Sequence, residues 1–223
     1  MLRRFLALAL VVTSVAVAQE ADPAAPAGRD HGLLGRIEGD QYYAPSGSYR
    51  ITIPLVDGLD GQIIDTPNVV SFRDPYSTYI TVWCHTQDAP QKWQYEVQGP
   101  KEALEEFFYD YVWRDFAAFP GAAYDTNARF QPRLYGGALF TFITLPGGSM
   151  FANPQFQIDP YAKPIVAKRG NMLFVHDGYI YVISTELAER VTQRDHYTLT
   201  DEEENILLRD RLTAIASRIH FLK

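Results

Sequence analysis

The apolar residues of this chain change their spacing along the sequence, and the changes restrict the folds that it can adopt. Residues 49–53 and 77–86 alternate apolar and polar side chains, which is the pattern of strands with one buried face. Between 101 and 119 the apolar residues recur every three or four positions, which predicts an amphipathic helix with an aromatic stripe. Strand patterns return at 133–145 and within 163–184. This order predicts an α+β fold with a largely antiparallel, twisted sheet.

Two long amphipathic helices are expected to pack against that sheet. A proline at the start and a Pro-Gly pair after the end bound the first helix, which we predict over residues 100–119. Thr200 followed by Glu203 forms a capping-box pattern, and the acidic residues after Thr200 complement the helix dipole. We therefore predict the second helix over residues 201–221.

The N-terminal residues have the organisation of an export signal. Arg3 and Arg4 precede an apolar stretch at 5–15, and residues 16–18, Ala-Val-Ala, fit a small-x-small cleavage site. The apolar stretch is too short to span a bilayer comfortably, so we expect cleavage after Ala18 and export by the general secretory route. A signal that stays uncleaved would instead make a membrane-anchored structural protein.

The whole chain is predicted to have three parts. Residues 1–18 are the predicted signal, 19–38 form a tether rich in Ala, Pro, Gly and Asp, and 39–223 form a single domain. The tether has no apolar period, so we expect it to be flexible. The mature protein is predicted to be soluble, periplasmic or secreted, and without a transmembrane segment.

The charge balance argues against a nucleic-acid partner. The chain has 27 Asp and Glu against 20 Lys and Arg, a formal net charge of −7, and removal of a signal containing Arg3 and Arg4 would make it −9. An acidic protein repels phosphate backbones unless it has a local basic patch. Arginines such as Arg36, Arg50 and Arg73 are scattered singly instead.

Cys84 is the single cysteine of the sequence, so no disulfide can form within the chain. It alternates with Ile80 and Val82 on one face of a predicted strand, while Thr81 and Trp83 take the other face. A nucleophilic or mixed-disulfide role is the alternative. We interpret Cys84 as a small buried hydrophobic residue.

Histidines and acids give only weak candidates for catalysis. Asp177-Gly178 beside His176 could be part of a catalytic or metal pair, but Asp-Gly between alternating runs is typical of a tight hairpin turn. His85 and Asp88 could join His176 or His196 in a metal site, yet the spacings of common metal motifs do not occur. We therefore predict no catalytic residues, no metal ligands and no cofactor.

Aromatic residues near strand ends are the best candidates for a binding face. Tyrosine and tryptophan suit such a face because they join a large apolar ring to a polar group. Aromatic residues are also enriched in ordinary strands, where they only pack. The outward parity of Tyr79, Thr81 and Trp83, opposite Cys84, makes this face worth testing. The candidate binding residues are Tyr42, Tyr43, Tyr76, Tyr79 and Trp83.

Two short segments resemble the PsbP/Mog1/DcrB-like α/β domains, and the chain also resembles exported bacterial proteins with no assigned role. From Tyr43 to Pro54 the chain reads Tyr-Ala-Pro-Ser-Gly-Ser-Tyr-x-Ile-x-Ile-Pro, an aromatic-glycine turn and a strand that stops at proline. Near the end it reads Ile-x-x-x-Ile-x-Phe over residues 215–221. The resemblance covers residues 39–223 in its order of elements. It implies an accessory or binding subunit and supplies no catalytic set to carry over.

These observations favour a soluble, exported, non-enzymatic binding or accessory protein of the cell envelope. Its partner is expected to be an envelope protein or a small apolar or sugar ligand, bound through exposed aromatic rings. The alternative is a hydrolase or metal-dependent enzyme that uses His85, His176 and neighbouring acids, which requires these side chains to converge.

Overall fold

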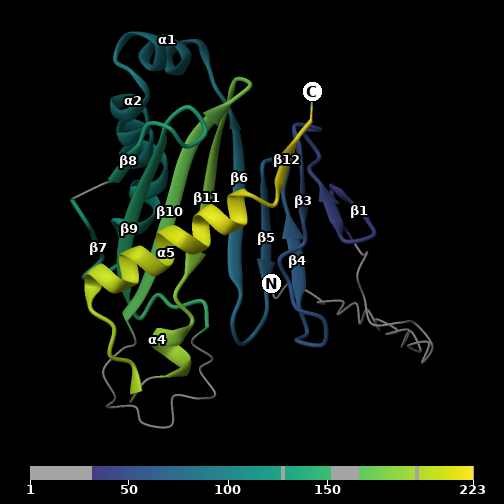
Figure 1. Ribbon diagram of the computed structural model, residues 1–223, viewed down its shortest axis with the longest axis vertical. Helices are drawn as coiled ribbons and strands as arrows, with labels where there is room; N and C mark the ends of the chain where they lie inside the picture. Colours follow the sequence, from purple (N-terminus) through teal and green to yellow (C-terminus); the bar gives the residue numbers. More distant parts are fainter. Residues whose placement is uncertain (1–31, 127–128, 152–165, 194–195, 223) are drawn as a thin grey trace, which may run out of the picture.

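The computed structural model describes residues 32–126, 129–151, 166–193 and 196–222 (Figure 1). The predicted signal peptide and residues 19–31 of the predicted tether lie outside the described residues. Among the described residues, no helix combines the length and the apolar character needed to cross a bilayer.

The larger of two antiparallel sheets forms the middle layer of the molecule. Its strands run in the order β4-β5-β6-β11-β10-β9-β7, and β8 also pairs with β9. The strands of the larger sheet are β4 (Gln62–Asp65), β5 (Val69–Arg73), β6 (Tyr79–Thr86), β7 (Ala123–Tyr124), β8 (Arg129–Gln131), β9 (Ala138–Pro146), β10 (Val166–His176) and β11 (Tyr179–Glu186).

The smaller sheet joins segments from opposite ends of the described chain. Its strands, in the order β1-β2-β3-β12, are β1 (Arg36–Glu38), β2 (Gln41–Tyr43), β3 (Tyr49–Thr52) and β12 (Ile219–Phe221). The strand β1 begins at Arg36, so ordered structure starts before the predicted domain boundary at residue 39. The helix predicted over residues 201–221 ends at Ala216, so the prediction was wrong in its last five residues.

That helix, α5, spans Asp201–Ala216 and is followed by β12, which pairs with β3. The backbone N–H of Leu222 donates to the Ser48 carbonyl at 2.8 Å, and that of Thr52 donates to the Arg218 carbonyl at 3.2 Å. Pairing with the open edge of β3 therefore satisfies backbone groups that a longer helix would have satisfied internally. The capping box at the start of α5 was predicted correctly, because Thr200 and Glu203 cap each other as expected.

The first predicted helix is a continuous but composite element. It comprises α2 (Pro100–Phe107), the π-helical segment η1 (Phe108–Trp113) and the short α3 (Arg114–Phe116), so it ends three residues earlier than the predicted end at 119. A further helix, α1 (Ala89–Val97), precedes it and was missed by the sequence analysis. The short α4 (Glu189–Thr192) follows β11.

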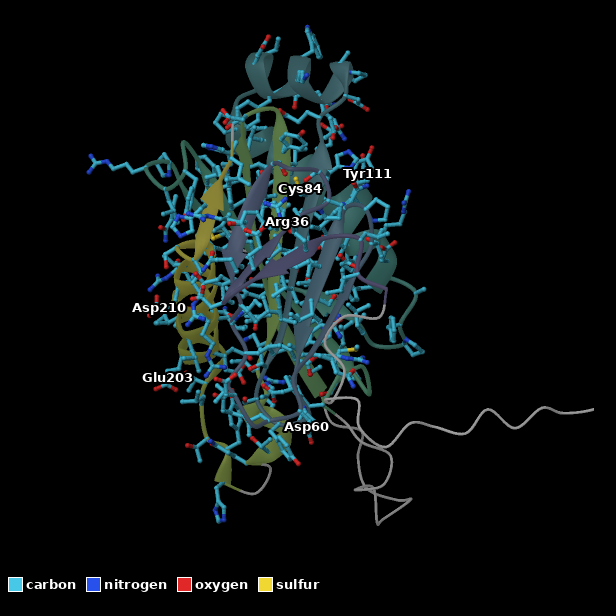
Figure 2. The ribbon with its side chains drawn as sticks, turned by 90° about the vertical axis from the view of Figure 1, so that its right-hand side faces the viewer. Arg36, Asp60, Cys84, Tyr111, Glu203 and Asp210 are labelled. Carbon is cyan, nitrogen blue, oxygen red and sulfur yellow. The ribbon has the colours of Figure 1, made fainter. Side chains whose placement is uncertain are left out.

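Helices cover opposite faces of the larger sheet, which confirms the predicted α+β architecture. Figure 2 shows Tyr111 of η1 on one side and Asp210 of α5 on the other. One core lies between the sheet, α5 and the smaller sheet, and includes Phe174 and Leu208. The second core lies under α2 and η1, where Phe107 faces Leu173 and its neighbours.

The connection between β10 and β11 is the tight turn that the sequence indicated. Asp177 and Gly178 have φ of 47° and 77°, the pair of positive values that a two-residue turn between twisted strands requires. His176 and Tyr179 pair directly on either side of it. This turn places the ends of β10 and β11 beneath α1 and α2.

Candidate functional site

The five aromatic candidates do not form one surface. Tyr42 is fully buried between the two sheets, and its hydroxyl donates to Asp65 Oδ2 at 2.8 Å. Burial, and then this carboxylate, raise the pKa of Tyr42 well above its usual value. Tyr43 lies on the opposite face of β2, with the Arg36 guanidinium 4.2 Å from its ring centre. Because Tyr42 is buried, it cannot contribute to an exposed binding face.

The remaining candidates follow β6. Tyr76 is 58% exposed in the turn before β6, and Tyr79 and Trp83 are half-buried on the outward face of that strand. Trp83 packs at 5.5 Å, centre to centre, from Phe107 of α2. The predicted parity of β6 is correct, since Cys84 lies in the opposite core at 4% exposure, 3.2 Å from the Ser48 hydroxyl. Burial raises the pKa of the Cys84 thiol, in agreement with its interpretation as a packing residue.

His85 and His176 do not converge. The His85 ring contacts Phe107 and Tyr111 on the face covered by α2 and η1. The His176 ring stacks on Phe221 of β12, 3.8 Å away, on the other face of the sheet. The two imidazoles therefore cannot share a metal ion. In the part of the chain that the structure describes, no group of three or more His, Cys, Asp and Glu side chains could hold one.

A cleft between α1, α2 and the end of the larger sheet is the candidate site. Its cavity has a volume of about 190 Å³. Figure 1 shows the two helices that bound it, with α1 at the top of the molecule and α2 below it. Its lining includes Gln87, Asp88, Gln91, Gln94, Tyr95, Ala103, Glu106, Phe107, Asp110 and Tyr111, with Val175 and Ile180 contributed by the sheet.

Local sequence signals build the α1 wall of this cleft. Asp88 caps α1, since its Oδ1 accepts from the Gln91 backbone N–H at 2.8 Å, and Gln91 Oε1 accepts from the Asp88 backbone N–H at 3.0 Å. Gly99 then reverses the chain with φ of 94°, a conformation that suits glycine. Pro100 starts α2 immediately afterwards. A short connection therefore joins the two helices, and the cleft lies between them.

The opposite wall is aromatic. The rings of Phe107 and Tyr111 stack with centres 4.6 Å apart and an angle of 18° between them. Tyr111 belongs to the π-helical turn η1, a type of local widening that often occurs at functional sites. His85 and Trp83 pack behind this pair. Tyr111 is half-buried, so part of its ring is accessible from the cleft.

The charged groups that line the cleft are all acidic. They are the carboxylates of Asp88, Glu106 and Asp110. Glu106 Oε1 accepts from Gln94 Nε2 at 2.9 Å, so its second oxygen is available. Burial raises the pKa of Tyr95, which keeps this lining phenol neutral. The electrostatic potential inside the cleft is therefore negative.

Two amide groups of the lining lack partners. Gln87 is 7% exposed, and its side chain makes no hydrogen bond to any described residue. The Nε2 of Gln91 is buried and also has no partner among the described residues. Buried polar groups are usually hydrogen-bonded, and leaving one unsatisfied costs about 1–3 kcal/mol. Gln91 Nε2 is therefore a buried donor of the lining that a ligand in the cleft would satisfy.

The sequence analysis missed this site. Its signal was the Asp88-x-x-Gln91 capping pattern with Pro90 in the first turn, which marks the start of α1. No spacing in the sequence could place Gln87 near Val175 and Ile180, because only the pairing of β6 with β11, and of β11 with β10, does so.

Fold and site together define an α+β domain with a small acidic and aromatic cleft at one end of its antiparallel sheet. No family model matches the chain, and no curated protein matches it. Among solved structures, the chain is similar to cyanobacterial PsbP from Synechocystis, with 12% identity, a TM-score of 0.45, and coverage of 88% of this chain and 99% of that one.

The chain is also similar to the yeast Ran-binding protein Mog1p from Saccharomyces cerevisiae, with 14% identity, a TM-score of 0.37, and coverage of 78% and 90%. A third similar structure, from Bacteroides thetaiotaomicron, has 8% identity and a TM-score of 0.41 over 84% of this chain. The chain spans 50% of the length of that protein. The similarity to PsbP and Mog1 is one of fold alone.

Proposed function

We propose that this chain is an exported, non-enzymatic binding or accessory protein of the cell envelope, and that it holds its ligand in the cleft between α1 and α2. The observation that carries this proposal is the buried Gln91 Nε2, which has no partner among the described residues and belongs to the lining of a cavity of about 190 Å³. A ligand that accepts from Gln91 Nε2 would offset the cost of burying this atom, and the Gln87 amide could bond the same ligand.

The composition of the lining supports binding. Amides, carboxylates and phenols orient a ligand, while Phe107, Val175 and Ile180 give it an apolar surface. Export is supported by the signal-like residues 1–18. The alternative of an enzyme built on His85 and His176 is not supported, because the two rings lie on opposite faces of the sheet.

Filling the cleft is expected to abolish ligand binding. Ala103 lines the cavity, so Ala103→Leu would occupy part of it without removing any polar group. Protein-observed NMR would be recorded against a panel of amines, neutral alcohols, monosaccharides and carboxylates. At least one compound should shift resonances of the cleft residues, and Ala103→Leu should weaken its binding by at least about tenfold.

The matched control is Ala118→Leu, an alanine that is exposed and lies outside the lining. It should leave the affinity unchanged. Both variants should retain the thermal stability of the parent protein. The proposal fails if no compound of the panel perturbs the cleft, or if both leucine variants bind as the parent does.

Export predicts a defined N-terminus. Protein isolated from the envelope or medium of a producing bacterium should begin at Gln19, because cleavage is expected after Ala18. Intact-mass spectrometry measures this directly. A mass that retains residues 1–18 would contradict cleavage, and accumulation in the cytoplasm alone would contradict export.

A further inference from the structure

The charges of the cleft select among ligand classes. Asp88, Glu106 and Asp110 line it, and the lining contains no lysine, arginine or histidine. Asp110 has no hydrogen-bond or ion-pair partner among the described residues, and Glu106 has one oxygen without a partner. An anionic ligand would meet like charges, whereas a cation would gain from each carboxylate.

The N-terminus of α1 does not reverse this preference. A helix N-terminus attracts anions because its first N–H groups point outwards. Here the Asp88 carboxylate already accepts from the Gln91 N–H at 2.8 Å. The positive end of the helix is thus neutralised by the protein's own side chain, and the net field in the cleft is that of the acids.

The aromatic wall adds a second attraction for a cation. Ring faces attract cations within about 6 Å of the ring centre, and tyrosine is effective in this role. Tyr111 lines the cleft and is stacked on Phe107, which fixes the orientation of its ring. Tyr95 contributes a neutral phenol from α1.

The two amide side chains of the lining indicate which hydrogen-bonding groups the ligand would carry beside its positive charge. The carbonyl oxygen of Gln87 can accept from an ammonium N–H, while Gln91 Nε2 can only donate and so requires an acceptor. The Oε1 of Gln91 is already used in capping α1. A cavity of about 190 Å³ has the volume of roughly six water molecules, which suits a compact ligand.

We propose that the cleft binds a small ammonium compound that carries a neutral oxygen acceptor a few bonds from its charge. This inference rests on the proposed binding function and names the ligand class of the same site. The carboxylates and the Tyr111 ring hold the ammonium group, and Gln91 Nε2 donates to the oxygen. The same chemistry could be supplied by a free amino alcohol or by a lysine side chain with its backbone carbonyl.

The test compares probes of matched size by NMR titration of the purified protein at low ionic strength. The probes are 4-aminobutan-1-ol, its neutral analogue butane-1,4-diol, pentylamine and 4-hydroxybutyrate. The amino alcohol should bind in the millimolar range expected for so few atoms, and about tenfold more tightly than the diol. Pentylamine should bind more weakly than the amino alcohol, and 4-hydroxybutyrate most weakly of all.

Removal of one charge should weaken only the cationic probes. Asp110→Asn should reduce the affinity for 4-aminobutan-1-ol by about three- to fivefold, as expected for an exposed carboxylate, and leave that for the diol unchanged. The control is Asp115→Asn, an exposed acid of α3 outside the lining, which should change neither affinity. Nα-acetyl-lysine methylamide provides the other source, and tighter binding of this probe than of the amino alcohol would identify a peptide ligand.

The outcomes separate this inference from the proposed function. If the diol or 4-hydroxybutyrate binds the cleft as tightly as the amino alcohol, or if Asp110→Asn has no effect, the ammonium assignment is wrong while the cleft remains a binding site. If no probe perturbs the cleft and the broader panel also fails, the proposed function itself is wrong.

Discussion

Replacement of Glu204 by glutamine is expected to lower the free energy of unfolding by about 3–5 kcal/mol. Glu204 has 0% exposure and accepts from Lys168 Nζ at 2.9 Å, Arg190 Nη2 at 2.8 Å and the Tyr197 hydroxyl at 2.8 Å. The side chain of Lys168 is itself only 4% exposed. The amide would leave two cations with one remaining acidic neighbour, Asp201, whose side chain is 85% exposed.

Chemical denaturation of the parent and the variant measures this loss. Asp210→Asn is the matched control, because Asp210 is on the same helix, is exposed and, among the described residues, pairs only with its neighbour Arg209. The control should change stability by less than about 0.5 kcal/mol. Equal effects of the two substitutions would show that the buried network does not stabilise the fold.

The same carboxyl gives stability a defined pH dependence. Burial alone would raise the pKa of Glu204, but the hydrogen bonds from Arg190, Lys168 and Tyr197 together hold it below its usual value. A carboxyl with a lowered folded-state pKa contributes fully above its unfolded pKa of about 4.3, and the contribution is lost as pH falls through the folded-state value. The parent should therefore lose stability below about pH 4.3 more steeply than Glu204→Gln.

Leu208→Ala is expected to cost about 2–5 kcal/mol, the range for a buried leucine whose cavity cannot collapse. Leu208 has 0% exposure and lies on α5 against Gly170 of β10. The approach is so close that a Cβ added to Gly170 would lie 3.0 Å from Leu208 Cβ. Because glycine has no side chain to move into the space, the cavity left by the truncation would stay open.

Urea denaturation would quantify the effect, with Ile206→Ala as the control. Ile206 is on the same helix and is 39% exposed, so its truncation should cost less than about 1 kcal/mol. A similar loss from both truncations would mean that α5 does not dock through the face that carries Leu208.

Elements with strong local signals could be predicted from the sequence. The turn at Asp177-Gly178 and the capping box of Thr200 and Glu203 depend on residues a few positions apart. The two faces of β6 follow from strict alternation, which placed Cys84 correctly in a core. In each case the physical cause lies within one short segment.

Helix α1 buries no residue and exposes Trp93 and Val97, so it has no apolar stripe, and only its capping pattern marks it in the sequence. Features that depend on distant contacts could not be predicted. The alternation around Tyr42 shows that one face of β2 is apolar, but not that a second sheet covers that face. The π-helical turn in η1 likewise leaves the three-to-four spacing of the apolar residues almost unchanged.

The smaller sheet has a consequence for how this protein is made. Strands β1, β2 and β3 are synthesised early, yet β3 acquires its second neighbour only when β12 emerges. Until then one edge of β3 carries backbone groups without partners, and contacts between such distant segments form slowly. The smaller sheet therefore stays incomplete until the ribosome has made β12, and the core that this sheet covers stays partly open to solvent until then.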